Sequence, residues 1–159
     1  MSRSWSWGTP WGPRIALSSD SRRVGRQVLV SPGGLTRLRL TPAVVAASAA
    51  WVLRRSPAAS AGLLRTMHGP GHTPRQLVVD WMTLVAKHVR TSTDPGKARI
   101  AARDVDRSVL VGDHDVFLPV RALAPTVRDT LGIEPQIVPS AGHLMIEEQP
   151  ARLASACLG

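Results

Sequence analysis

One aspartate and one histidine stand where two apolar runs of the sequence end. Asp115 follows the run SVLV at residues 108–111, and His143 follows the run QIV at 136–138 through a loop of small residues at 140–142. A carboxylate that holds an imidazole in one tautomer makes the histidine a general base, and small neighbours leave the ring room to swing. The pair predicts acid–base chemistry, and the alternative for His143 is a structural loop histidine whose nitrogens are satisfied by hydrogen bonds.

The elements that must hold this pair alternate between short apolar runs and helical stretches. The run QVLV at 27–30 is β-branched and ends in the turn residues SPGG. Runs that are apolar on both faces suit a parallel sheet covered by helices. We therefore predict an α/β fold with strands at 27–30, 108–111 and 136–138, and helices at 121–131, closed by Gly132, and at 149–158.

The stretch from residue 36 to about residue 100 is expected to be wholly helical. Breaks at Ser56-Pro57 and at the segment HGPGHTP, residues 68–74, divide it into helices at 42–55, 58–67 and 75–90. In the third helix the spacing predicts one buried face, made of Leu77, Trp81, Leu84, Val85 and His88. On that face His88 is expected at the edge of the core.

Three segments carry a family resemblance: VLVSPGGL (28–35), VLVGDHDVFLP (109–119) and VPSAGHLMIEEQP (138–150). From about Val24 to Leu158 the chain resembles the C-terminal half of the α/β-hydrolases, in which a serine, an acid and a histidine follow in that chain order. The resemblance implies a partial α/β-hydrolase fold, a short and mainly parallel sheet with a helical cap inserted. Its core would be residues 24–35 and 108–159, and its cap residues 36–107.

The same resemblance implies roles for the polar residues. Asp115 would be the orienting acid, His143 the general base, and Asp113 a residue that caps or solvates the turn. The family's nucleophile lies on a G-x-S-x-G elbow, and SWSWG at residues 4–8 lies at about the right distance, so Ser6 is the candidate nucleophile within an N-terminal segment 1–23.

Around Ser6 the sequence departs from that pattern. Ser4 replaces the first glycine of the elbow, and Pro10, Gly12 and Pro13 fall where the following helix should begin. The family's oxyanion loop would lie upstream of the first residue. We therefore expect an N-terminally truncated family member.

The predicted function is a serine hydrolase that acts on a small-molecule carboxylic ester or related acyl substrate through an acyl-enzyme. The alternative is a non-catalytic remnant or interaction module. Trp51, Trp81 and Met67 could line an acyl pocket, although helix packing explains them equally well.

No cofactor and no metal are expected. His68 and His72 have a metal-binding spacing, but Gly69, Pro70 and Gly71 deny them a common helix, so a loop role is favoured. Gly33 and Gly34 lack the G-x-G-x-x-G spacing of a nucleotide loop. His114 is expected to face solvent.

A net charge of +9 raises nucleic acid as a partner, but the arginines are scattered and no aromatic residues alternate with them. A basic nucleic-acid binder is therefore the third hypothesis. The absence of a signal peptide and of a membrane-length apolar run predicts a cytoplasmic protein without membrane contact. The single Cys157 is expected to be a small buried residue. An exposed sheet edge could pair with a second copy of the chain.

Overall fold

The computed structural model describes residues 16–19, 21–88, 99–100 and 105–158. The helices and strands follow in the order β1 (Arg26–Val30), α2 (Pro42–Arg54), α3 (Pro57–Met67), α4 (Gln76–His88), β2 (Asp106–Gly112), α5 (Val120–Leu131), β3 (Gln136–Val138), α6 (Met145–Glu148) and α7 (Pro150–Leu158). The predicted strands and helices are confirmed over the described residues, with ends that shift by a few residues, and the predicted helical part beyond residue 88 lies outside them. The short helix α6 was not predicted, because its four residues are too few to show a periodicity.

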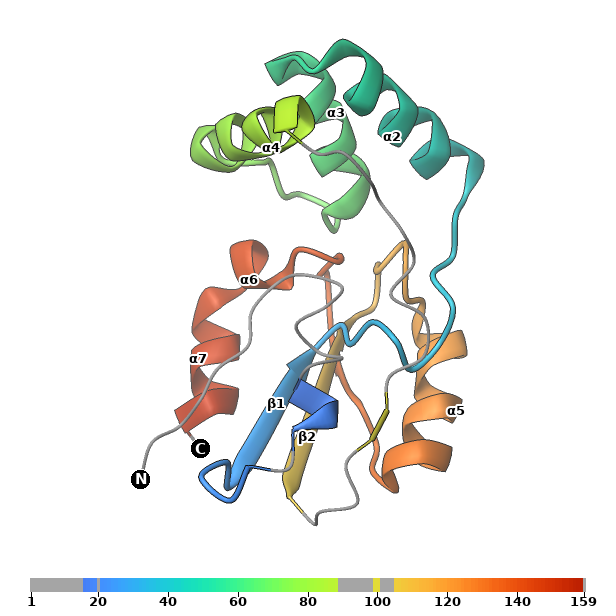
Figure 1. Ribbon diagram of the computed structural model, residues 1–159, viewed down its shortest axis with the longest axis vertical. Helices are drawn as coiled ribbons and strands as arrows, with labels where there is room; N and C mark the ends of the chain where they lie inside the picture. Colours follow the sequence, from blue (N-terminus) through green and yellow to red (C-terminus); the bar gives the residue numbers. More distant parts are fainter. Residues whose placement is uncertain (1–15, 20, 89–98, 101–104, 159) are drawn as a thin grey trace.

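The three strands form one parallel sheet in the order β1-β2-β3. Arg26 lies opposite Asp106, and Leu110 lies opposite Gln136. The carboxyl ends of the strands point toward α2, α3 and α4, which we call the helical insertion (Figure 1). Residues at these strand ends are therefore the ones that meet the insertion.

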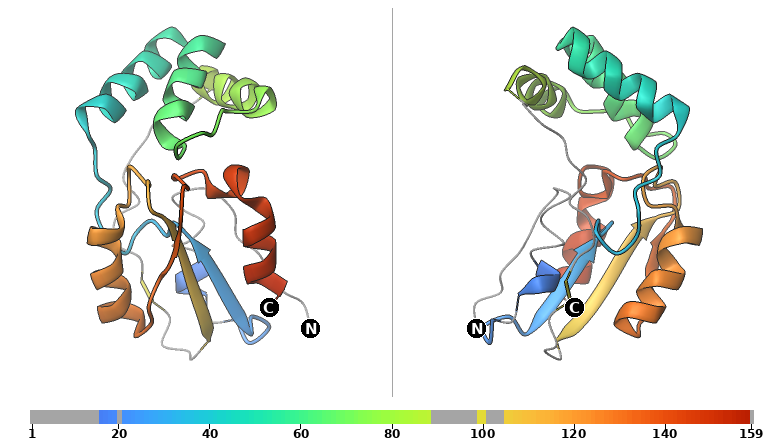
Figure 2. Two further views of the ribbon diagram at one scale, coloured as in Figure 1. Left: turned by 180° about the vertical axis from the view of Figure 1, so that it is seen from behind. Right: turned by 45° about the vertical axis from the view of Figure 1, so that its right-hand side comes forward.

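Helices cover both faces of the sheet, which is why β2 is apolar along its buried half. Val109 and Val111 face α5 in one buried cluster with Leu123 and Val127. Leu110 faces the other way and belongs to a second cluster, whose other members are Val138, Ala141, Met145 and Leu153. The two views in Figure 2 show α5 and α7 on opposite sides of the strands. Cys157 is buried, as predicted.

Local sequence signals set the helix ends. Thr41 and Ser56 cap α2 and α3, and their hydroxyl oxygens accept hydrogen bonds from the N–H groups of Val44 and Ala59. A proline follows each cap, where the missing N–H costs nothing. As predicted, α5 ends at Gly132, which adopts a left-handed conformation with φ 68°.

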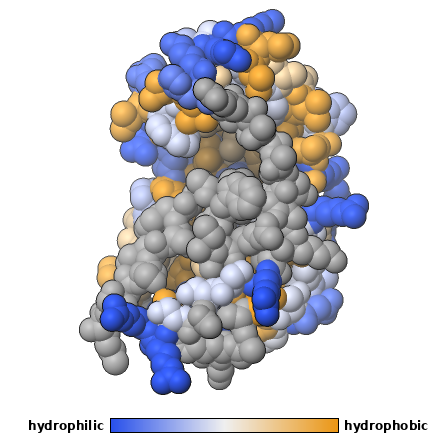
Figure 3. Space-filling view, viewed as in Figure 1, coloured by the Kyte–Doolittle hydropathy of each residue, from blue (hydrophilic) through white to orange (hydrophobic). Residues whose placement is uncertain are grey.

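The predicted buried face of α4 is wrong. Leu77, Trp81 and Leu84 are 75%, 56% and 56% exposed, and His88 is exposed as well. The helix instead buries Val79, Thr83 and Ala86, which have helical spacing too. In Figure 3 apolar and polar side chains accordingly lie intermingled on the surface of the insertion, at the top.

None of the described helices is long and apolar enough to cross a membrane.

Candidate functional site

The turn after β2 fixes the carboxylate of Asp115. The backbone N–H of Asp115 donates to the Gly112 carbonyl over 3.2 Å. Its Oδ1 accepts hydrogen bonds of 2.9 Å from the N–H groups of both Phe117 and Leu118. The side chain has no exposed surface. An aspartate that bonds to the backbone two and three residues ahead makes its own turn, so the sequence GDHD needs no other element to place this carboxylate.

His143 meets this carboxylate from the loop after β3. Its Nδ1 lies 2.9 Å from Oδ2 and 3.1 Å from Oδ1 of Asp115. The ring of Phe117 packs edge-on against the imidazole, with the ring centroids 4.9 Å apart. The imidazole keeps 23% of its side-chain surface exposed. The carboxylate therefore selects the tautomer with the proton on Nδ1 and leaves Nε2 to accept a proton.

Backbone contacts hold the two loops together. Asp113 donates its N–H to the Val138 carbonyl, and His114 donates to the Ala141 carbonyl. In return, Asp113 Oδ1 accepts the N–H of Ala141 over 3.2 Å. A Cβ atom at Gly112 would lie 2.5 Å from the Gly142 carbonyl oxygen, so only glycine allows this approach. The spacing of Asp115 and His143 is thus set by the backbone.

The electrostatics of the pair favour an ionised Asp115. Burial alone would raise the pKa of its carboxyl group. The hydrogen bond and charge of His143, the Leu118 N–H and the neighbouring Ser31 hydroxyl outweigh burial and hold the pKa below its usual value. A carboxylate that stays charged can stabilise the imidazolium that forms when His143 takes up a proton.

Two buried polar residues beside the site were not predicted. Ser31 ends β1 in a left-handed conformation with φ 43°, and its N–H donates to the Leu110 carbonyl over 2.8 Å. His68 is buried, and its Nε2 lies 3.2 Å from Glu147 Oε2. A serine directly after an apolar strand was a usable signal for the first, whereas nothing in the sequence ties residue 68 to residue 147.

The other candidates fall outside this arrangement. Ser6 lies outside the described residues. His114 is half exposed, as predicted, and its Nδ1 lies 2.7 Å from Asp113 Oδ1. Asp113 joins the two loops, beyond the turn-capping role that was expected. Within the described part of the chain, no group of three or more histidine, cysteine, aspartate or glutamate side chains could hold a metal ion.

Of the three residues considered for an acyl pocket or for helix packing, Trp51 has the packing role. Trp51 Nε1 donates to the Met82 carbonyl, which ties α2 to α4. Met67 contributes its carbonyl oxygen to the His143 N–H over 2.8 Å. Trp81 is on the exposed side of α4.

Comparison with known proteins shows the family and the fold. The model of the alpha/beta hydrolase family matches residues 4–156. Among solved structures, a meta-cleavage product hydrolase from Pseudomonas fluorescens is similar at a TM-score of 0.66 and 18% identity, over 94% of this chain and 61% of that chain. An aryl esterase described from Burkholderia cenocepacia is similar at 0.65 and 16%, over 96% and 60%.

A carboxylesterase from Bacillus subtilis is similar at a TM-score of 0.58 and 19% identity, over 86% of this chain and 50% of that chain. The chain therefore spans about half to three fifths of these similar structures. No curated protein sequence matches it.

Proposed function

The chain belongs to the alpha/beta hydrolase family, and on that premise we propose that it is a serine hydrolase of carboxylic esters or related acyl compounds. The observation that carries the proposal is the Asp115–His143 pair, a buried carboxylate 2.9 Å from Nδ1 of a partly exposed imidazole. The esterases among the similar structures support an ester as the substrate class.

In the proposed reaction the Ser6 hydroxyl is the nucleophile. Its oxygen attacks the acyl carbon while His143 Nε2 takes the hydroxyl proton, and Asp115 stabilises the imidazolium. The ester C–O bond then breaks, the alcohol leaves with that proton, and an acyl-enzyme remains. A water molecule, deprotonated by His143, attacks the acyl carbon and releases the carboxylic acid and the serine.

Labelling with a serine-reactive fluorophosphonate tests this function. We expect the folded protein to be labelled, and labelling to disappear in Ser6→Ala and in His143→Ala. Ser4→Ala is the matched control, since it lies in the same segment and should still be labelled. No labelling of folded wild-type protein would contradict the proposal and favour a non-catalytic interaction module.

Turnover of a small chromogenic ester gives a second measurement. Asn at position 115 keeps an oxygen for the N–H groups of Phe117 and Leu118 but turns an amide toward His143 Nδ1. That change favours the wrong tautomer, so we expect Asp115→Asn to fold and to lose about 10⁴-fold in kcat. An active Asp115→Asn would show that the pair is structural.

We further propose a cytoplasmic protein whose partner, apart from its substrate, is a second copy of the chain. Among the described residues β1 pairs only with β2, and its other edge could receive a strand. Light scattering over a range of concentrations tests this association. A strictly monomeric species at all concentrations would contradict it.

A further inference from the structure

The end of α3 and the loop that carries His143 touch through their backbones. His143 donates its N–H to the Met67 carbonyl over 2.8 Å. A Cβ atom at Gly69 would lie 2.5 Å from the Ser140 carbonyl oxygen, and one at Gly142 would lie 2.5 Å from the Gly69 nitrogen. Because no side chain separates the two segments, neither can shift without displacing the other.

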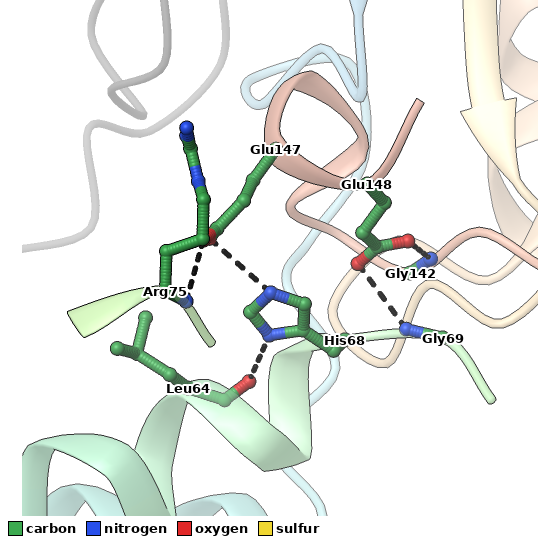
Figure 4. Close-up of polar contacts among 7 residues, drawn as sticks. All are labelled: Leu64, His68, Gly69, Arg75, Gly142, Glu147 and Glu148. Carbon is green, nitrogen blue, oxygen red and sulfur yellow. Dashed lines mark hydrogen bonds and ion pairs between the residues drawn. The ribbon is translucent and has the colours of Figure 1, made fainter. Parts of the chain in front are cut away.

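The carboxylate of Glu148 bridges the same two segments. Its Oε1 accepts the Gly69 N–H over 3.2 Å, and its Oε2 accepts the Gly142 N–H over 2.6 Å (Figure 4). One donor belongs to the helical insertion and the other directly precedes His143. An ionised carboxylate can accept from both sides at once, and such charge-assisted bonds are stronger than neutral ones.

Glu147, the residue before Glu148 in α6, adds contacts to the helical insertion. Glu147 Oε1 accepts the backbone N–H of Arg75 over 2.9 Å, and Arg75 Nε lies 3.2 Å from the same oxygen. The side chains of His68 and Glu147 are only 2% and 9% exposed. His68 Nδ1 lies 2.7 Å from the Leu64 carbonyl, so both ring nitrogens of this buried histidine face oxygen atoms (Figure 4).

We propose that Glu148 is a positioning residue that fastens the His143 loop to the helical insertion, so that the placement of the insertion and the Asp115–His143 geometry change together. This deepens the proposed function and rests on it, because the place of the imidazole matters for rate only if His143 is a general base. A ligand that moves the end of α3 then also moves the imidazole.

The variant Glu148→Gln tests the bridge with almost no change of shape. One carboxylate oxygen becomes an NH2 group, which turns a donor toward either the Gly69 or the Gly142 N–H. We expect amide hydrogen exchange at that glycine to become about tenfold faster or more. The low-field NMR signal of the His143 Nδ1 proton, which reports its bond to Asp115, should shift or broaden.

Glu134→Gln is the matched control, because Glu134 is an exposed glutamate that pairs with Arg128 at the end of α5, away from the junction. It should leave the glycine exchange and the His143 signal unchanged. In turnover of a small ester we expect Glu148→Gln to lower kcat several-fold with little change in KM, since the bridge acts on the base and not on binding.

Gly69→Ala tests the same coupling from the insertion. The added Cβ presses on the Ser140 carbonyl, whereas Gly62→Ala in α3 has nothing within 4 Å and serves as the control. The His143 signal should change in the first variant and not in the second. Both can be measured without any turnover.

The possible results distinguish a failure of the positioning proposal from a failure of the proposed function. If the wild-type protein shows the low-field His143 signal and both Glu148→Gln and Gly69→Ala keep it unchanged, the positioning proposal fails alone. If the wild type lacks the signal and is not labelled by the fluorophosphonate, the proposed function fails as well. Loss of the fold in both variants would show that the junction serves stability only, which also overturns the proposal.

Discussion

The loops after β2 and β3 and the helical insertion are held by different kinds of contact. In the loops, backbone groups bond directly to one another and to the carboxylates of Asp113 and Asp115, with no room for an added Cβ at Gly112. In the insertion, helices pack through side chains such as Leu64 and Ala86 and leave Leu77 and Trp81 exposed.

This difference indicates which regions of the chain tolerate substitutions. Side-chain packing between helices can adjust to substitutions by changes of rotamer and small shifts. Backbone groups in van der Waals contact cannot, because moving one loop breaks several hydrogen bonds at once. The Asp115–His143 pair lies in the part that is fixed, and the helix–helix contacts within the insertion are the part that can vary.

One glycine-to-alanine substitution in each region tests this difference most directly. Gly112→Ala would place a Cβ 2.5 Å from the Gly142 carbonyl oxygen, and we expect a loss of about 4 kcal/mol in unfolding free energy. Gly62→Ala, within α3 and with open space around it, should gain about 0.5–1 kcal/mol through helix propensity. Urea denaturation followed by circular dichroism measures both. Equal stabilities would show that the loops yield as easily as the helices.

Removing the carboxylate itself should have the next largest effect. Asp115→Ala leaves the buried N–H groups of Phe117 and Leu118 without their acceptor, which we expect to cost about 3 kcal/mol. Asp115→Asn keeps one oxygen for them and should cost about 1 kcal/mol. The same denaturation experiment compares the two variants. Equal losses in both would mean that charge, and not the turn, accounts for the stability.

Low pH should destabilise the loops by protonating Asp115. The pKa of Asp115 in the folded protein is below its usual value, so its ionised form stabilises the fold above the unfolded pKa of about 3.9. That contribution is lost as the pH falls through the lower, folded pKa. We expect the stability difference between wild type and Asp115→Asn to narrow as the pH falls below 4. A difference that stays constant down to pH 2 would argue against a charged Asp115.

The smallest effect is expected inside the insertion. The hydroxyl groups of Thr83 and Ser60 are buried and 2.8 Å apart, and they join α4 to α3. Thr83→Val leaves the Ser60 hydroxyl without this partner and should cost about 1 kcal/mol. The double variant with Ser60→Ala should cost little more than either single change, because the two residues share one interaction. Additive losses would show that the hydroxyls act independently.

The sequence was sufficient to predict the parallel sheet and the proximity of Asp115 and His143. Short runs such as VLVG are typical of buried strands because apolar residues on both faces suit a parallel sheet covered by helices. Asp115 and His143 follow their strands directly, so local chain geometry brings them to one edge of the sheet. The bonds between the Asp115 carboxylate and the His143 ring join only the two loops.

The buried face of α4 and the junction at His68 could not be predicted from the sequence. Both depend on how separate elements pack against one another. In α4 the stripe of Leu77, Trp81 and Leu84 and the stripe of Val79, Thr83 and Ala86 have the same helical spacing. Packing against α2 and α3 decides which stripe is buried. The junction of His68 with Glu147 joins residues of ordinary polar type across two separate elements, and a single sequence contains no signal for it.

The position of the insertion between β1 and β2 has a consequence for folding kinetics. Gln27 and its sheet partner Arg107 are 80 residues apart along the chain, and closing so long a loop has a large entropic cost before any strand contact forms. The helix pairs of the insertion, in contrast, connect near neighbours in the sequence. We therefore expect α2, α3 and α4 to form early and shorten the effective loop, and the pairing of β1 with β2 to limit the rate of refolding.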